Sequence, residues 1–226
     1  MPMAYNHRLL KAEFHCHTYR SSDCLMKPWD LVALCKERGI DCLVVTDHNT
    51  IRGALEVKEI APFAVVIGEE ILSTEGEIIG LFLTEEVPRG LSPRDTVRRI
   101  RAQGGLVYLP HPFDRLRRSC LSERGRKEIE DEIDIVEVLN ARITFPQDVE
   151  RAARFALKLG AAMANGSDAH IPWEVGRAYV EMPAFTGRDD FLHALQQGYL
   201  KGRLSPPWVH LASTTSKWLK RFNMRR

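Results

Sequence analysis

The 226-residue sequence lacks the features that mark several special classes of protein. Its five cysteines are odd in number and form no Cys-x-x-Cys pair, which argues against a disulfide framework and a zinc ribbon. No apolar stretch approaches the roughly 20 residues of a membrane span, and the N-terminus has no apolar signal segment. The formal net charge of +2 is too small for nucleic-acid binding by overall electrostatics. We therefore expect a cytoplasmic protein with reduced cysteines and no transmembrane segment.

The chain also lacks internal repeats and low-complexity segments, and its length suits one domain with a sizeable core. Ser205-Pro206-Pro207 forms a linker, so we expect one domain over residues 1–204 and a basic tail over residues 205–226. Tryptophan, leucine and phenylalanine alternate with lysine and arginine in this tail. We expect its apolar face to pack on the domain. The alternative is a basic amphipathic helix for an acidic membrane surface or nucleic acid.

Short apolar runs alternate with helical patterns along the chain, which is typical of βα units with a mostly parallel sheet. Proline, serine and glycine mark the helix ends, and the pattern predicts helices from Pro28 to Gly39, Ser92 to Gly104, Pro146 to Leu159 and Asp189 to Gln197. Seven candidate strands lie at 12–17, 42–46, 64–70, 78–83, 106–110, 133–139 and 161–165. The sequence therefore predicts an α/β fold with a compact, distorted or incomplete barrel.

A His-x-His motif ends the first candidate strand. Side chains alternate along a strand, so His15 and His17 should project from one face while Cys16 points the other way. Two neighbouring imidazoles can bind a divalent metal ion. A chance His-x-His on a surface strand is common, so this motif alone does not decide between a metal site and none.

Four further groups of ligand-type residues each follow an apolar run of their own. They are Thr46-Asp47-His48, Gly68-Glu69-Glu70, Pro110-His111-Pro112 and Asn165-Gly166-Ser167-Asp168-Ala169-His170. Asp23, in the loop after His17, is a further candidate ligand. A barrel with one metal site at its strand ends requires this repeated pattern.

The kind and number of candidate ligands indicate which metals they would bind. Imidazole and carboxylate ligands without a thiolate cluster favour Zn, Mn or Fe. The ligands exceed what one ion needs, and two or three ions that share a bridging carboxylate hydrolyse phosphate esters. Glu69 and Glu70 compete for one inward position. Asp47 should lie behind the ligands, because it points away from His48 if the strand continues.

In their order along the chain, these residues resemble the motifs of the PHP (polymerase and histidinol phosphatase) family. The resemblance covers about residues 11–175 and implies a TIM-like, distorted (β/α)7 barrel, here with a short C-terminal extension. It also implies a two- or three-metal centre that hydrolyses phosphoesters with a metal-activated hydroxide, and it favours Glu70 over Glu69. The family pattern assigns the first ion to His15, His17, Glu70 and Asp168, the second to Glu70 and His111, and the third to Asp23, His48 and His170.

One departure from the family pattern affects the second ion. Many relatives have a histidine in the strand after the Gly-x-Glu motif, whereas residues 76–83 contain none. Either Glu77 replaces that histidine or the second ion site is weak. The sequence leaves both interpretations open.

A phosphoesterase also needs cations that bind the ester. Arg20 lies between His17 and Asp23, and Arg115 follows His111, so both could present guanidinium groups to a phosphate. Arg117, Arg118 and Asn140 are weaker candidates for the pocket.

The expected function is therefore metal-dependent hydrolysis of a small phosphomonoester or nucleotide. One alternative is a 5′- or 3′-end nuclease on short nucleic acid, although aromatic stacking platforms are not evident near the motifs. Another is an amidohydrolase-type enzyme, which also begins with His-x-His but usually needs a bridging lysine. A third is a non-catalytic, metal-stabilised interaction module.

Overall fold

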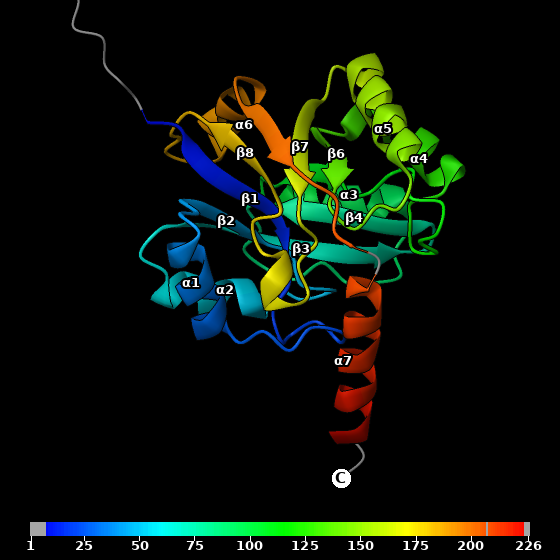
Figure 1. Cartoon of the computed structure of the whole chain (residues 1–226). Coiled ribbons are helices and arrows are strands. Elements are labelled where there is room, and N and C mark those ends of the chain that lie inside the picture. Colours follow the sequence, from blue (N-terminus) through cyan, green and yellow to red (C-terminus); the bar gives the residue numbers. More distant parts are fainter. Residues whose placement is uncertain (1–7, 207, 224–226) are drawn as a thin grey trace, which may run out of the picture.

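The apolar runs of the sequence form one sheet of nine strands, in the order β7-β6-β5-β4-β3-β2-β1-β8-β9 (Figure 1). The computed structural model describes residues 8–206 and 208–223. The strands are β1 (Leu10–Cys16), β2 (Cys42–Val45), β3 (Ala64–Ser73), β4 (Gly76–Leu81), β5 (Leu106–Leu109), β6 (Ile135–Asn140), β7 (Ala162–Gly166), β8 (Ala178–Met182) and β9 (Tyr199–Gly202).

The sheet curls until its two sides nearly meet. Ala169, just after β7, pairs with Cys16 of β1. The backbone N–H of His17 donates to the Ala169 carbonyl at 3.0 Å, and the Ala169 N–H donates to the His15 carbonyl at 3.3 Å. Strands β1 to β7 thus form the predicted barrel-like α/β fold.

The predicted count of seven strands is wrong, because the described sheet has nine. The seven predicted strands correspond to β1 to β7. Strand β8 adds antiparallel to β1, and β9 adds antiparallel to β8. All four residues of β9 are exposed, so it has no apolar pattern to reveal it. Strand β8 does alternate buried and half-buried residues, which is a usable signal for a half-buried strand.

The barrel is distorted because β4 runs antiparallel to both of its neighbours, β3 and β5. A tight hairpin joins β3 to β4 where a helix would join two parallel strands. Gly76 begins β4 with φ +129°, and a Cβ there would come within 2.6 Å of the Cys120 backbone. This hairpin places Glu77 on a strand directly beside Glu70's strand.

Seven α-helices occur in the described residues. They are α1 (Pro28–Glu37), α2 (Arg52–Ile60), α3 (Pro93–Ala102), α4 (Glu123–Ile129), α5 (Pro146–Leu159), α6 (Arg188–Gln196) and α7 (Val209–Asn223), with 3-10 turns η1 (Glu130–Glu132) and η2 (Pro172–Glu174). The four predicted helices are α1, α3, α5 and α6. Helices α2 and α4 were not predicted: α2 has neither a proline nor a side-chain cap at its start, and α4 is mostly charged.

The core has an inner and an outer part. Inside the barrel, Phe14, Val44 and Tyr108 pack with Phe191 and Leu195 of α6, which covers one end. Helices α1 and α2 cover the outside of one half of the sheet, and α3, α4 and α5 cover the other half. The second end of the barrel, at the carboxyl ends of the parallel strands, is left for polar side chains.

The tail departs from its expected packing. Its first residue in α7, Val209, is fully buried, but Trp218 is 68% exposed and Leu219 is 52% exposed. The lysine side faces the domain instead: Lys220 Nζ donates to the backbone carbonyl of Ser21 at 2.6 Å and to that of Tyr19. The expected packing of Leu211 and Phe222 concerns side chains outside the described ones.

The length and polarity of the helices also bear on membrane insertion. Within residues 8–206 and 208–223, no helix is both long enough and apolar enough to span a bilayer.

Candidate metal centre

The predicted ligands gather at the end of the barrel opposite α6. A local irregularity in β1 aims the first two. Ala12 and Phe14 point into the inner core, so strict alternation would point Cys16 inward as well. The β1–β2 register shifts between Glu13 and Cys16, and Cys16 packs in the outer core under α1 and α2. His15 and His17 therefore both face the cluster, with ring centroids 5.1 Å apart.

Four buried atoms converge here, one from each of these two rings and one from each of two carboxylates. Nε2 of His15 lies 3.5 Å from Glu70 Oε2 and 3.6 Å from Asp168 Oδ1. Nε2 of His17 lies 3.5 Å and 3.2 Å from the same two oxygens. Ligand atoms around a tetrahedral ion with bonds of about 2.1 Å are about 3.4 Å apart. None of the four atoms has a hydrogen-bond partner among the described residues, so their spacing fits one bound cation.

Glu70 also faces a second group through its other oxygen. Its Oε1 lies 2.9 Å from His111 Nε2. Glu77 lies beside this pair, with Oε2 3.6 Å from His111 Nε2 and Oε1 3.7 Å from His48 Nδ1. The structure thus places Glu77, from the strand after the Gly-x-Glu motif, beside His111, and the buried Oε2 of Glu77 has no hydrogen-bond partner among the described residues.

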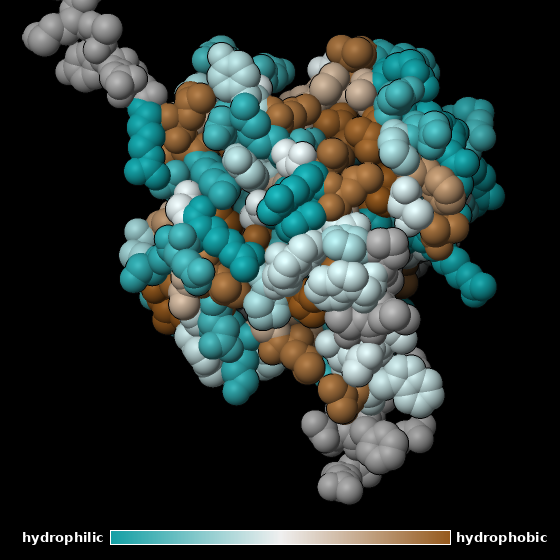
Figure 2. Space-filling view, viewed as in Figure 1, coloured by the Kyte–Doolittle hydropathy of each residue, from teal (hydrophilic) through white to brown (hydrophobic). Residues whose placement is uncertain are grey.

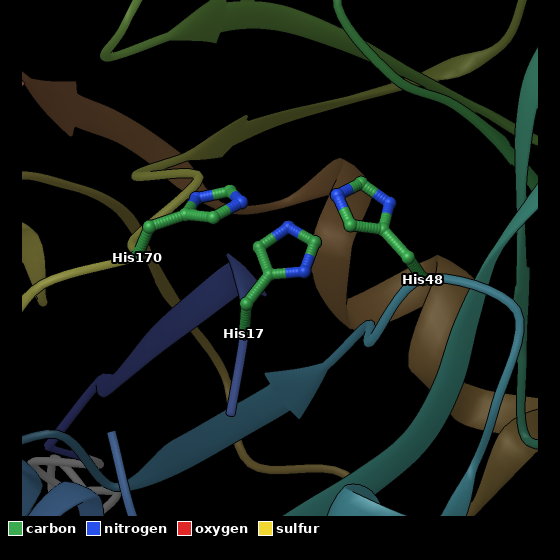
Figure 3. Close-up of side chains that lie close together, drawn as sticks. All are labelled: His17, His48 and His170. Carbon is green, nitrogen blue, oxygen red and sulfur yellow. The ribbon is translucent and has the colours of Figure 1, made fainter. Parts of the chain in front are cut away.

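A third group lies nearer the surface. Asp23 Oδ1 is 3.3 Å from His170 Nε2, and Asp23 Oδ2 is 3.7 Å from His48 Nε2. Figure 3 shows the rings of His17, His48 and His170 pointing toward one another from three different segments. The structure therefore brings all of the predicted ligands together: His15, His17, Asp23, His48, Glu70, His111, Asp168 and His170.

Glu137 of β6 positions two of these histidines and is not among the predicted site residues. Its carboxylate lies 3.0 Å from His15 Nδ1 and accepts the backbone N–H of His111 at 2.8 Å. A Cβ at Gly166 would come within 2.2 Å of the Glu137 carboxylate, so only glycine fits there. A charged residue inside the otherwise apolar strand Ile135–Asn140 is the signal that could have revealed Glu137.

A chain of hydrogen bonds orients His17 from the other side of its ring. Its Nδ1 lies 3.1 Å from Ser21 Oγ, and Ser21 Oγ donates to Asp47 Oδ1 at 2.7 Å. Asp47 also accepts from the backbone and hydroxyl of Thr18. Asp47 therefore lies behind the ligands, where the sequence places it. Such hydrogen bonds fix the orientation of a ligating ring.

The electrostatics of the cluster favour ionised carboxylates. Burial alone would raise the pKa of Glu70, but His15 and His48 hold it well below its usual range. Burial would likewise raise the pKa of Asp168, and Arg117 and His15 lower it strongly. Burial and the nearby His170 lower the pKa of His17, which keeps its imidazole neutral. Ionised carboxylates and a neutral His17 are protonation states that metal ligands require, whereas the charge of Glu137 outweighs burial and raises the pKa of His15, and the charge of Glu70 does the same for His48.

Two of the candidate ligands have a strained backbone conformation. His111 has φ +31° and Asp168 has φ +52°, in the left-handed region that non-glycine residues seldom adopt. Each such residue costs on the order of 1–3 kcal/mol, and such residues concentrate at functional sites.

A cavity of about 590 Å³ opens onto the cluster. His48, His170, Asp23 and Glu77 line its inner wall, and its basic residues are Arg89, Arg117, Arg142 and Lys217. Arg117 forms an ion pair with Asp168, and Arg142 Nη1 lies 2.9 Å from His170 Nδ1. Of these four cations only Arg117 is among the residues predicted for the pocket. Lys217 comes from α7, so the tail forms part of the cavity wall.

The structure does not bring the two predicted phosphate-binding arginines to this cavity. Arg20 pairs with Glu56, with its Nε 2.9 Å from Oε1, and Arg115 Nη2 pairs with Asp148 Oδ1 at 2.6 Å. A nearby carboxylate captures each guanidinium, which the spacing along the chain could not reveal. Asn140 does reach the cluster, because its Nδ2 donates to Asp168 Oδ2 at 3.2 Å.

Comparisons with known proteins show what the chain is similar to. Residues 146–200 match the family model described as PHP-associated. A crystal structure of a two-domain protein from Bacteroides vulgatus, which contains a predicted PHP-like metal-dependent phosphoesterase, has a TM-score of 0.71 and 19% identity, covering 92% of this chain and 69% of that one. Endonuclease Q in complex with a 27-mer duplex substrate, with an abasic lesion at the active site, has a TM-score of 0.64 and 12% identity, covering 83% of this chain and 56% of that one.

Two proteins of Methanocaldococcus jannaschii are similar in sequence. The uncharacterized protein MJ1587 is 41% identical over 145 residues, which cover 58% of this chain and 82% of that protein. The uncharacterized protein MJ0417 is 39% identical over 176 residues, which cover 76% of this chain and 70% of that protein.

The fold and the histidine–carboxylate cluster define the class as a barrel of the type found in PHP-like metal-dependent phosphoesterases. The chain contains a PHP-family domain.

Proposed function

We propose that this protein is a metal-dependent phosphoesterase that hydrolyses a small phosphomonoester or a nucleotide in the cavity beside the cluster. The observation that carries the proposal is the convergence of four buried ligand atoms, from His15, His17, Glu70 and Asp168, that have no hydrogen-bond partner among the described residues. Polar atoms buried in this way cost free energy unless a partner binds them. A divalent cation is the partner that suits two imidazoles and two carboxylates.

The donor set has room for two or three ions of Mn, Zn or Fe. We assign His15, His17, Glu70 and Asp168 to the first, Glu70, Glu77 and His111 to the second, and Asp23, His48 and His170 to the third. Glu77 supplies the ligand that the second ion would otherwise lack. Bound ions supply activation of water and neutralisation of charge on the phosphoryl oxygens.

The basic residues of the cavity would bind and orient the phosphate. Arg117 is half-buried against Asp168, and the charge of Asp168 outweighs the desolvation and raises the pKa of this guanidinium, so Arg117 stays charged. Arg89 and Lys217 line the cavity and have no ion-pair partner among the described residues. Guanidinium groups suit phosphate because they present paired donors in a plane. We therefore propose Arg117, Arg89 and Lys217 as substrate-binding residues in place of Arg20 and Arg115.

The experiment is inorganic phosphate release by the Mn-loaded protein from sugar phosphates, histidinol phosphate, nucleotides and short oligonucleotides. His17→Ala removes a proposed ligand. His193→Ala is its matched control, because His193 is exposed on α6 and contacts Gln197. Activity lost in His17→Ala and retained in His193→Ala supports the proposal. Equal activity in both variants would contradict it.

A second candidate is an end nuclease on short nucleic acid. The similarity of the fold to endonuclease Q, whose structure holds a DNA duplex, favours testing it. The two candidates differ in their preferred substrate. A nuclease would release mononucleotides from an end-labelled oligonucleotide faster than it releases phosphate from a free nucleotide. No release from any ester despite bound metal would favour an amidohydrolase or a non-catalytic module.

A further inference from the structure

A second cavity lies apart from the metal centre and shares no lining residue with the first one. It has a volume of about 390 Å³ and forms where the start of β1, the end of α1, the segment around η2 and the end of β9 meet. We call it the arginine cavity. Its lining residues are Lys11, Arg38, Trp173, Val175, Gly176, Arg177 and Arg203.

Main-chain carbonyls and an aromatic ring hold three of these cations in place. Lys11 Nζ donates to the Arg38 carbonyl at 3.0 Å. Arg38 Nη1 donates to the Pro172 carbonyl at 2.7 Å. Arg177 Nη2 donates to the Leu204 carbonyl at 2.6 Å, and the guanidinium of Arg177 stacks over the Trp173 ring at 4.0 Å. The cations are thus oriented without using carboxylate partners.

These cations lack the ion pairs that other basic residues of the protein form. Arg101 pairs with Asp134 at 2.7 Å and Arg124 pairs with Glu75 at 2.6 Å. Within the described residues, no such pair involves Lys11, Arg38, Arg177 or Arg203. Arg177 Nε is also buried and has no hydrogen-bond partner among the described residues.

The concentration of like charge is unfavourable without a ligand. Burial, and next the charge of Arg203, lower the pKa of the Arg177 guanidinium. Like charges placed together destabilise the folded state unless counter-charge is supplied. An anion of suitable size would supply it and would also satisfy the free donors.

We propose that the arginine cavity binds a phosphate group of a nucleotide or of a nucleic-acid strand. Phosphate matches three planar guanidinium groups and one ammonium group, which can donate paired hydrogen bonds to its oxygens. The cavity is open to such a ligand, since Arg203 is exposed and Trp173 is 39% exposed. Figure 2 shows hydrophilic side chains among white and brown ones on the face in front of β1 and the end of β9. This site is independent of the proposed hydrolysis.

The test measures binding of inorganic phosphate to the Mn-loaded full-length protein by equilibrium dialysis. The variants are Arg203→Gln, at an exposed side chain, and Arg203→Gln combined with Arg177→Gln. The controls are Arg98→Gln alone and with Arg154→Gln, which remove the same charge from exposed helix positions. One charged hydrogen bond contributes roughly 1.5–3 kcal/mol. Each cavity substitution should therefore weaken phosphate binding at the arginine cavity at least about tenfold.

The possible outcomes separate this proposal from the proposed hydrolysis. Weakened binding in the cavity variants, with binding retained in the controls and with ester hydrolysis unchanged, supports the arginine cavity as a phosphate site. Phosphate binding that is the same in cavity variants, controls and wild type overturns it, whatever the hydrolysis assays give. Arg203→Gln by itself keeps the test valid if the double variant does not fold.

A second pair of probes distinguishes the two sources of phosphate. For a nucleotide site, AMP should bind as tightly as a twelve-residue oligothymidylate, and Arg203→Gln should weaken both. For a nucleic-acid site, affinity should rise with strand length, and Arg203→Gln should reduce the salt dependence of oligonucleotide binding by about 0.7 in log–log slope. Arg203→Gln without effect on either probe would contradict the proposal.

Discussion

The two ends of the barrel are built from the same strands and have opposite chemistry. At one end Phe14, Phe191 and Leu195 form a sealed apolar plug under α6. At the other end His15, Glu70 and Asp168 are equally buried, yet several of their polar atoms have no partner among the described residues. The first end stabilises the fold by removing apolar surface from water. The second end costs stability unless cations bind, so it is the end that function explains.

Among the residues of the polar end, Glu70 should have the largest effect on activity. Glu70→Gln keeps the size of the side chain but removes the charge that faces both ion groups. We expect phosphoester hydrolysis to fall at least about 10³-fold, since this costs several kcal/mol of transition-state stabilisation. The measurement is the kcat/KM of the Mn-loaded enzyme on its best substrate.

The neighbouring residue offers a matched control for that change. Glu69 is also buried, but it faces away and accepts the Val87 N–H at 2.8 Å, which an amide oxygen can still do. Burial raises the pKa of Glu69 to about 7, so the loss of its charge should matter little. A Glu69→Gln variant as inactive as Glu70→Gln would contradict the assignment of the inward position to Glu70.

The apolar end should respond in stability rather than in chemistry. Phe191→Ala removes a fully buried ring that contacts Phe14 at 5.7 Å between centroids. We expect a loss of about 3–5 kcal/mol in the free energy of unfolding, measured by urea denaturation. Metal stoichiometry at low temperature should stay unchanged. A variant that loses metal but not stability would show that the two ends are not separate in the way described.

Removal of metal should destabilise the polar end. Chelation leaves the carboxylates of Glu70 and Asp168 close together without a cation. At metal concentrations of 100 to 1,000 times Kd, bound ions stabilise the native state by about 2.7–4.1 kcal/mol, and chelation removes this stabilisation. Thermal unfolding with and without EDTA measures the effect. His17→Ala should show a smaller EDTA shift, whereas an equal shift would mean that the metal binds elsewhere.

The smallest expected effect is at Glu137, which touches the ligands rather than the ions. Glu137→Gln should lower metal affinity about 10–100-fold, because it weakens the hydrogen bond that orients His15. Competition with a fluorescent chelator gives the affinity. Glu181→Gln, on β8 beside Lys201, is the control for loss of one carboxylate elsewhere in the sheet. Unchanged affinity in Glu137→Gln would remove Glu137 from the metal centre.

Most of the barrel could be predicted from local patterns. Strands β1 to β7 are apolar runs, and α1, α3, α5 and α6 carry clear end signals. Strand β9 was missed because it pairs at an open edge with exposed side chains. The expected packing of Trp218 on the domain was wrong: Lys220 donates to two main-chain carbonyls on a loop far away in sequence, and Trp218 remains exposed. Such long-range contacts leave no periodic trace.

The sequence by itself determined the residue types of the metal centre and their order along the chain, since each group follows the apolar run that forms its strand. Only the tertiary structure decided how they meet. The irregularity in β1 turns His15 inward, and the β3–β4 hairpin brings Glu77 beside His111. The tertiary structure also decided that Arg117, rather than Arg20 or Arg115, reaches the ligands. The physical reason is that a side chain pairs with its nearest complementary charge in space, and spacing along the chain does not fix that distance.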